Sequence, residues 1–362
     1  SIKKRGSSSR FFAKKQYSIK TILASGKKHP LSLIGLPKGS HWVLYGPFVD
    51  RSYLRNALAY TIGKNFENTD QPYFSPKWRF VWLSINKQTK GLYMLIEKIK
   101  KNNNKINISS YKKNCSFNKM PFIAEISSRA GDFKTKNKTS IRFRYPNKKD
   151  IKFLKKHNPI EYYKTTAIIR LSLEELEENI LTNTTLERLK KILNLNSIID
   201  YMIIQEIFKN IDGYRRSVYF YRNSKGIFNF GPIWDFNLAM GNVRLYGSQN
   251  PTNWLVEHNT HEIPHAFYFR KLWNIKEFKI LFKKRYLTLR KNIISNDSII
   301  NTINKLAESI RNYSTKDYEI WDNKRNFISN YFLNTKTKGY CFKDHKDILN
   351  TWMIQRLKWI DK

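Results

Sequence analysis

Cysteine, proline, glycine and acidic side chains are all scarce in this chain of 362 residues. The two cysteines, Cys115 and Cys341, are too few for a disulfide framework or for a zinc site built from thiolates. Sequence alone does not decide whether they pair with each other. We find no internal repeat and no low-complexity linker, and no apolar run approaches the ~20 residues that a membrane-spanning helix needs.

The shortage of acidic residues gives the chain a net charge of +39, from 67 Lys and Arg against 28 Asp and Glu. A charge of this size points to nucleic acid, anionic lipid or ligands that carry phosphate. However, a composition rich in Lys, Asn and Ile is also what an AT-rich genome encodes, whatever the function. The charge is spread along the whole chain rather than gathered in a tail, so we expect nucleic acid not to be the main partner.

Hydrophobic residues make up 41% of the chain and aromatic residues 15%, which indicates a folded protein. The length suits one large domain or two lobes that each have a core. The chain starts at Ser1 rather than at methionine, so a signal peptide removed from its start would be invisible here.

The first part of the chain, residues 1–150, is predicted to be rich in β-strands. RGSSSR (5–10) reads as a basic turn and KKQYSIK (14–20) as a strand, and residues 50–64 predict a helix with Asp50 as its cap. FVWLSIN (80–86) and GLYMLIEKI (91–99) predict a hairpin, and MPFIAEIS (120–127) is expected to join the same sheet. Residues 132–150 read as loop with a short strand, RFRYP.

The second part, residues 151–362, is predicted to be mainly helical. Two short helices are expected at 174–181 and 185–193, and a buried helix at 197–210 with Ser197 as its cap. A hairpin of SVYFYR (217–222) and IFNF (227–230) follows, and several amphipathic helices fill 266–362. Strands followed by helices predict an α+β fold with two lobes.

Two carboxylates flank that second hairpin. Asp212 lies just before its first strand, and Asp235 follows its second strand within GPIWDFNLAMGN (231–242). Because a hairpin returns its two ends to one place, the carboxylates are predicted to converge, which a divalent cation between them would make tolerable. Protein kinases use this layout, with one Asp for the hydroxyl proton and one for Mg²⁺. Alternatively, Asp212-Gly213 is a turn signal and Asp235 caps a turn.

Several long runs resemble the CotH kinase family, spore-coat-kinase-like proteins with an atypical protein-kinase fold. In chain order the matching runs are RGSSSR and KKQYSIK (5–20), GLPKGSHWVLYGPFVDRSYLRNALAY (35–60), FVWLSINKQTKGLYMLIEKI (80–99), NIDGYRRSVYFYR (210–222), GPIWDFNLAMGN (231–242) and LNTWMIQRLKWID (349–361). They cover nearly the whole chain and keep the expected order. The resemblance implies a two-lobed protein-kinase-like fold, with a β-rich lobe at 1–150 and a helical lobe at 151–362 that carries the catalytic hairpin at 210–242.

The resemblance also implies transfer of the γ-phosphoryl group of ATP, with Mg²⁺ or Mn²⁺, to Ser or Thr hydroxyls of a protein substrate. It implies Asp212 as the catalytic carboxylate and Asp235 as the metal ligand. Arg5 and Lys15 would contact phosphate, as would backbone N–H groups around Ser7. Glu97 matches an acidic position of the family, and it would either pair with Lys15 or help to hold metal.

Two positions depart from the family's pattern. Asn237 stands where a second acid usually follows the metal-binding one, and an amide oxygen ligates metal without contributing charge. Arg216 and Ser217 stand where some members carry Asn, and the Ser217 hydroxyl is a weaker candidate ligand. The alternatives are a pseudokinase or surface adhesion module of the same fold, and a basic nucleic-acid binder.

One further cluster of side chains resembles a metal site. His258 and His261 lie near two carboxylates, which suggests zinc, but the spacing fits no helical zinc motif and Pro264 interrupts it, so a polar loop is expected instead. The family resemblance favours a location outside the cytoplasm, at a cell surface or in a spore coat. The oligomeric state and the acceptor protein stay open.

Overall fold

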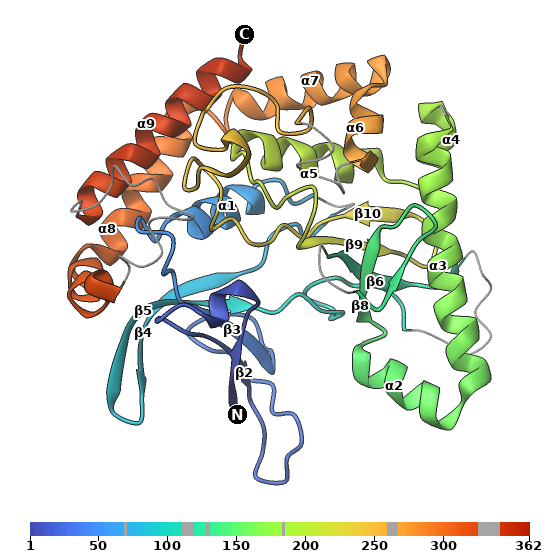
Figure 1. The fold of residues 1–362 in the computed structure, drawn as a ribbon, viewed down its shortest axis with the longest axis horizontal. Helices are drawn as coiled ribbons and strands as arrows, with labels where there is room; N and C mark the ends of the chain where they lie inside the picture. The colour runs from blue at the N-terminus through green and yellow to red at the C-terminus, as the bar shows by residue number, and fades with distance from the viewer. Residues whose placement is uncertain (69–70, 111–118, 128–130, 183–184, 259–266, 325–340) are drawn as a thin grey trace.

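The computed structural model describes residues 1–68, 71–110, 119–127, 131–182, 185–258, 267–324 and 341–362. Two antiparallel five-stranded sheets and a large set of helices form the molecule (Figure 1). This is the predicted α+β arrangement of two lobes. None of the helices in the described ranges is long and apolar enough to cross a membrane.

The first sheet is built from the N-terminal part of the chain. Its spatial order is β1 (Ile2–Arg5), β2 (Gln16–Lys20), β3 (His41–Tyr45), β5 (Gln88–Glu97) and β4 (Trp78–Ile85). β4 and β5 form the predicted hairpin. Successive side chains of β3 point to opposite faces of the sheet, and both faces are buried. Trp42 and Leu44 lie in a small hydrophobic cluster on one face, and Val43 and Tyr45 lie in the main core on the other.

The second sheet combines strands from both parts of the chain. Its order is β10 (Phe228–Phe230), β9 (Val218–Arg222), β6 (Phe122–Ile126), β8 (Ser140–Tyr145) and β7 (Phe133–Lys134). The strand predicted at 120–127 is therefore present, but its assignment to the first sheet was wrong. β6 pairs with β8 and β9, so strands on either side of residue 150 share one sheet. β-Propensity indicates that a segment forms a strand, but it does not indicate which other strand pairs with it.

Helix α1 (Arg55–Lys64) follows β3. The C-terminal part contains α2 (Lys148–His157), α3 (Pro159–Leu181), α4 (Leu186–Lys190), α5 (Leu195–Ile207), α6 (Phe267–Trp273), α7 (Lys276–Arg290), α8 (Asn296–Trp321) and α9 (Phe342–Ile360). Short 3-10 turns occur at Ser8–Arg10, Leu245–Gly247 and Asp322–Lys324. The helical character predicted for the last hundred residues is confirmed in α6 to α9.

Three predicted helix starts were wrong for local reasons. α3 begins at Pro159, with the Asn158 side chain accepting the Glu161 N–H, so it is much longer than the predicted 174–181. α5 is capped by Asn194 instead of Ser197. Asp50 precedes α1 by several residues, although its carboxylate still accepts the Arg55 N–H at 3.0 Å.

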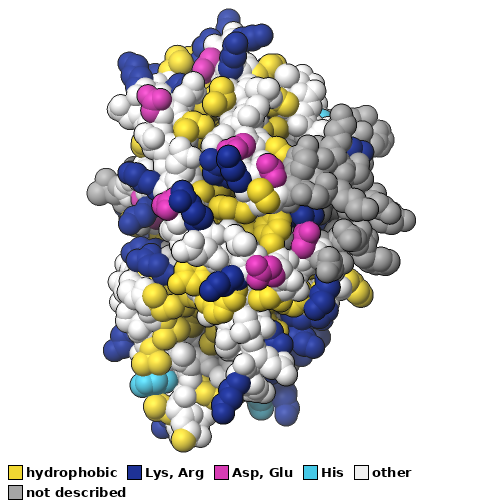
Figure 2. All heavy atoms as spheres, turned by 90° about the vertical axis from the view of Figure 1, so that its left-hand side faces the viewer, with side chains coloured by type: hydrophobic (Ala, Val, Ile, Leu, Met, Phe, Trp, Pro, Cys, Tyr) yellow, Lys and Arg dark blue, Asp and Glu magenta, His cyan; other side chains and the backbone are white. Residues whose placement is uncertain are grey.

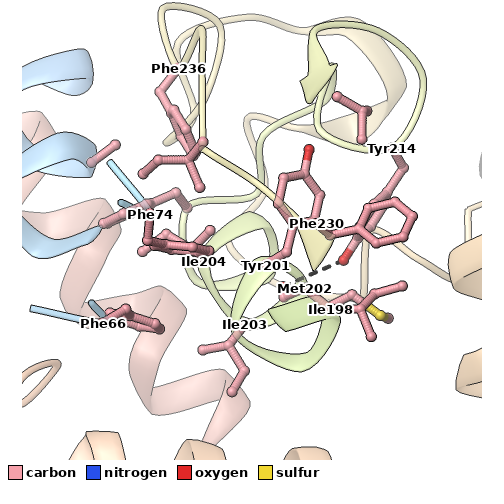
Figure 3. Packing of buried hydrophobic residues seen from close by; sticks show 14 of the residues in the cluster. Phe66, Phe74, Ile198, Tyr201, Met202, Ile203, Ile204, Tyr214, Phe230 and Phe236 are labelled. Atoms are coloured by element: carbon pink, nitrogen blue, oxygen red, sulfur yellow. Dashed lines mark hydrogen bonds between the residues drawn. The ribbon is translucent and has the colours of Figure 1, made fainter. Parts of the chain in front are cut away.

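The core is centred on α5, whose side chains are buried on nearly every face, as predicted. Figure 3 shows Tyr201 of this helix among the rings that pack against it, which include Tyr214 and Phe230. Removing one such side chain would cost about 3–5 kcal/mol of stability. Because the loop before β9 begins at the end of α5, this rigid helix fixes the start of the predicted catalytic segment.

Candidate active site

The hairpin of β9 and β10 brings the two segments that carry Asp212 and Asp235 together. Phe220 lies opposite Phe230 in the register, and the pairing continues with the Gly231 N–H donating to the Tyr219 carbonyl at 2.8 Å. The segment before β9 and the segment after β10 therefore leave the sheet at the same end, which is the convergence that the sequence predicts.

Buried hydrogen bonds to α5 hold the loop that contains Asp212. The Tyr214 hydroxyl donates to the Glu206 carboxylate at 2.9 Å, and the Tyr201 hydroxyl donates to the Gly213 carbonyl at 2.7 Å. A Cβ atom on Gly213 would lie 2.2 Å from the Gln205 side-chain oxygen, so glycine lets the loop pack closely on the helix. The buried ion pair of Glu206 with Arg356, at 3.1 Å, ties the same end of α5 to α9.

Asp212 is buried between two arginines. The Arg215 Nη2 atom lies 2.8 Å from Asp212 Oδ1, and the Arg216 Nε atom lies 3.2 Å from it. Neither contact has the geometry of a hydrogen bond, so Oδ1 is a buried oxygen without a hydrogen-bond donor among the described residues. The carboxylate is therefore compensated in charge while it keeps the capacity to accept a proton or a hydrogen bond.

Asp235 is half-buried and forms no ion pair within the described residues. Its backbone N–H donates to the Tyr60 hydroxyl at 3.2 Å, and the next N–H, of Phe236, donates to the Asn56 side chain at 2.8 Å. Both partners belong to α1, so this helix of the N-terminal part sets the conformation of the segment. The φ angle of Asp235 is 67°, a left-handed conformation that is uncommon outside glycine.

The environment of Asp235 is unfavourable to a bare negative charge. Burial, followed by repulsion from Asp212, raises the pKa of the Asp235 carboxyl to about 6, although Arg5 and Arg216 oppose the rise. A cation at this position would replace the missing partner. The strained backbone and the raised pKa are both features that concentrate at functional sites.

A pocket of about 870 Å³ joins these groups. It lies between the first sheet, the second sheet and the segment after β10. Its lining includes four further side chains predicted for the site, namely Arg5, Ser7, Ser217 and Asn237, beside Asp212 and Asp235. The lining also holds basic residues from both sheets and from two neighbouring loops, Lys3, Lys4, Arg10, Arg142, Arg144 and Arg216. The pocket therefore combines Asp212, Asp235 and a third acid, Glu125, with a strongly cationic wall.

Lys15 and Glu97 lie outside the pocket lining. The Lys15 ammonium group donates to the Arg10 carbonyl at 2.8 Å on the surface. Glu97 is fully buried, lies 3.2 Å from the Lys105 ammonium group and accepts the Lys77 N–H. The sequence left two roles open for Glu97, an ion pair with Lys15 or a metal contact. In the described residues Glu97 pairs with Lys105 and not with Lys15.

The neighbouring Lys14 has a different environment. Its ammonium group forms a fully buried ion pair with Asp317 of α8, at 2.6 Å, and lies over the rings of Tyr53 and Tyr93. Asp317 also accepts the Leu92 N–H of β5 at 2.8 Å. This pair fixes the segment between the Gly6–Arg10 turn and β2 to the C-terminal helices.

Several pocket residues were not predicted. Arg144 of β8 forms an ion pair with Glu125 of β6, and both line the pocket, as does Tyr219. Arg142 and Arg144 are two positions apart in the strand RFRYP, so their side chains share one face of the strand. This spacing was the only sign in the sequence that both could line a pocket. Phe11 also lines the pocket although 89% of its surface is exposed, so it offers an apolar surface at the rim.

The described residues contain no group of three or more His, Cys, Asp and Glu side chains arranged to hold a metal ion. The suggested zinc pair is only partly covered, since His261 lies outside the described residues and His258 accepts a hydrogen bond from Arg270 through its carbonyl. A divalent ion in the pocket would therefore have to use Asp235, neutral oxygens such as those of Asn237 or Ser217, and oxygens of the ligand.

Comparison with known proteins adds one finding. A family model described as CotH kinase protein matches residues 2–360. The match includes both sheets, the hairpin and every residue named for the pocket. No curated protein matches the chain.

Proposed function

This chain belongs to the CotH kinase protein family, and on that premise we propose that it transfers the γ-phosphoryl group of ATP to a Ser or Thr hydroxyl of a protein. The observation that carries the proposal is the pocket that contains Asp212 and Asp235 together with a cationic wall. Phosphoryl transfer depends mainly on positioning and charge neutralisation, and these groups supply both.

Asp212 is the proposed general base. Its Oδ1 atom is buried without a hydrogen-bond donor among the described residues, so it can accept the proton of an acceptor hydroxyl as that oxygen attacks phosphorus. Arg215 and Arg216 compensate its charge, which keeps the buried carboxylate acceptable in the folded protein. The loop that carries it is fixed by the hydrogen bonds to α5, so little reorganisation is needed.

Asp235 is the proposed metal ligand, with Asn237 and Ser217 as neutral oxygen donors beside it. The fit rests on the half-buried Asp235 carboxylate, which lacks an ion-pair partner in the described part of the chain and is repelled by Asp212. A bound Mg²⁺ or Mn²⁺ would neutralise phosphate charge. Arg5 and the Ser7 turn are proposed to contact phosphate oxygens, and the exposed ring of Phe11 is proposed to cover the base.

One observation favours a second candidate, a pseudokinase that binds nucleotide without transfer. Asn237 lines the pocket but brings no charge, and no third acid completes a metal cluster among the described residues. Such a protein would bind metal and nucleotide more weakly than a site with two ligating carboxylates.

The test is transfer of label from γ-labelled ATP to a Ser-rich acceptor, with Mg²⁺ and with Mn²⁺. Asp212→Asn should lower transfer at least about 100-fold, because the proton acceptor is lost, while nucleotide affinity stays within a few-fold. The matched control is Asp361→Asn, a carboxylate just after α9 that bonds to Arg290 and Tyr286. Transfer at the wild-type rate by Asp212→Asn would refute the assignment, and nucleotide binding without any transfer would support the pseudokinase.

A further inference from the structure

Beyond the pocket, the first sheet carries a group of basic residues that the proposed phosphoryl transfer does not use. Lys20 ends β2, His41 begins β3, and Lys98 follows β5. Lys28 forms an isolated antiparallel bridge with Ile22, two residues after β2, and Lys100 follows Lys98 by two positions. Both lower the pKa of His41 by charge repulsion, after burial as the main cause. We name these five residues, Lys20, Lys28, His41, Lys98 and Lys100, the basic track.

Three residues of the track, Lys20, His41 and Lys98, lie on the face of the sheet that lines the pocket. Lys20 is opposite His41 in the register of β2 and β3, and the Lys98 N–H donates to the His41 carbonyl. Successive residues of a strand alternate between faces, so Lys20 shares a face with Ser18 and Gln16. By the same rule His41 shares a face with Val43 and Tyr45, and Lys98 with Ile96. All five of these neighbours line the pocket.

Lys98 connects the track to the pocket electrostatically. Burial, together with repulsion from Arg144 and Arg5, lowers the pKa of the Lys98 ammonium group. Arg144 and Arg5 both line the pocket, where Arg5 is proposed to contact phosphate. Lys98 is therefore close enough to two arginines of the pocket to feel their charges.

The charges of the track are uncompensated. Its four lysines form no ion pair with Asp or Glu in the described part of the chain, and the buried Glu97 pairs with Lys105 instead. The lysines repel one another, and burial with that repulsion lowers the pKa of Lys100 to about 7. By contrast, the side of the molecule that carries α8 and α9 has Lys and Arg interspersed with Asp and Glu (Figure 2).

We propose that the basic track binds an anionic segment of the protein substrate, one rich in Asp, Glu or phosphoserine, and so presents an adjacent Ser or Thr to the pocket. The inference rests on the proposed function, because it takes the pocket as the site of transfer. A bound row of carboxylates or phosphates would supply the counter-charges that the track lacks, which gives specificity for acceptors with acidic neighbours.

A polypeptide fits the track better than a nucleic acid does. Single-stranded nucleic acids are bound by basic grooves whose aromatic side chains stack on the bases. Trp42, which follows His41 of the track in β3, is fully buried and offers no stacking surface there. The track also leads directly into the pocket where a serine hydroxyl would react, and a peptide can extend from that hydroxyl along the sheet.

The test uses fluorescent peptides that contain one serine beside a block of six residues, made of Glu, of phosphoserine or of Gln. Binding is measured by anisotropy without ATP, so that it is independent of phosphoryl transfer. The track variant is Lys20→Gln/Lys28→Gln/Lys100→Gln, which leaves every pocket residue in place. Its control is Lys283→Gln/Lys284→Gln/Lys291→Gln, the same charge change at exposed lysines in or next to α7.

We expect the Glu or phosphoserine peptide to bind more tightly than the Gln peptide, and the track variant to lose about tenfold or more in affinity. The control variant should lose no more affinity for the anionic peptides than its reduced net charge explains. The stronger of the two anionic peptides identifies the kind of segment. Equal binding of the Gln peptide, or equal loss in both variants, would overturn the proposal.

Two further measurements separate this proposal from its alternatives. An oligonucleotide that binds more tightly than the peptides, and that loses affinity only in the track variant, would make the track a nucleic-acid surface and overturn the proposal. If label transfer occurs, the track variant should raise KM for the acidic acceptor while kcat is maintained. If no transfer occurs although the acidic peptide binds through the track, the proposed function fails and the binding surface stands.

Discussion

Replacing Asp235 with Asn should make the protein without metal more stable while removing its proposed function. The folded state raises the pKa of this carboxyl from 3.8 to about 6 through burial and repulsion from Asp212. A raised pKa in the folded state means that the group favours folding at low pH and that this contribution is lost as the pH rises through 6. At pH 8 the wild-type chain therefore carries an unfavourable charge that the Asp235→Asn variant lacks.

The expected size of the effect follows from the two pKa values. Between pH 8 and pH 5 protonation of Asp235 should recover roughly 1–2 kcal/mol of the folding free energy. The stability advantage of Asp235→Asn over wild type should therefore be larger at pH 8 than at pH 5 by that amount. Urea unfolding at both pH values, with a chelator present, measures it directly.

The control for this experiment is Asp361→Asn. Partial burial acts to raise the pKa of the Asp361 carboxyl, but hydrogen bonds from Arg290 and Tyr286 outweigh it and lower that pKa. The Asp361 carboxylate stabilises the fold at every pH above its pKa in the unfolded chain. Asp361→Asn should therefore lose a similar free energy of unfolding at pH 5 and at pH 8. An Asp235→Asn protein that is destabilised equally at both pH values would refute the reasoning, because Asp235 would then have a favourable partner in the folded state.

Three other predictions concern the same groups. Because metal binds the deprotonated Asp235 carboxylate, Mn²⁺ affinity should fall by about tenfold per pH unit below pH 6, which calorimetry at several pH values would measure. Asn237→Asp should tighten Mn²⁺ binding by roughly tenfold, since it adds a charged ligand, and unchanged binding would place Asn237 away from the ion. Lys14→Met should destabilise the fold by about 3–5 kcal/mol in urea unfolding, because it removes the buried ammonium group that compensates the Asp317 charge, and Asp317→Asn in the same chain should restore part of that loss.

The sequence predicted local features of this fold much better than its long-range contacts. The hairpin of β9 and β10, the burial of α5 and the amphipathic C-terminal helices depend on periodicity and turn residues, which are visible in a short window. The placement of β6 beside β9 depends on pairing between distant segments, which no window contains. The start of α3 was missed because Asn158 and Pro159, a cap and a favourable first residue, were not recognised.

The same division applies to the candidate site. The convergence of Asp212 and Asp235 was predictable because a hairpin requires it. The choice of Lys15 as a phosphate contact could not be checked from sequence, because β2 begins only at Gln16 and the irregular backbone of residues 11–15 decides where each lysine points. The structure places Lys15 on the surface and buries Lys14. Glu125 and Arg144 were missed because their pairing joins two strands that are not consecutive.

The buried pair of Lys14 and Asp317 joins residues that are 303 positions apart. During synthesis on the ribosome, the N-terminal segment emerges long before α8 does. Until α8 emerges, Asp317 is not available to compensate the Lys14 ammonium group, and burying this charge without Asp317 would be unfavourable. A nascent chain that has not reached α8 therefore cannot complete this side of the pocket. The pocket can therefore be complete only after most of the protein has been translated.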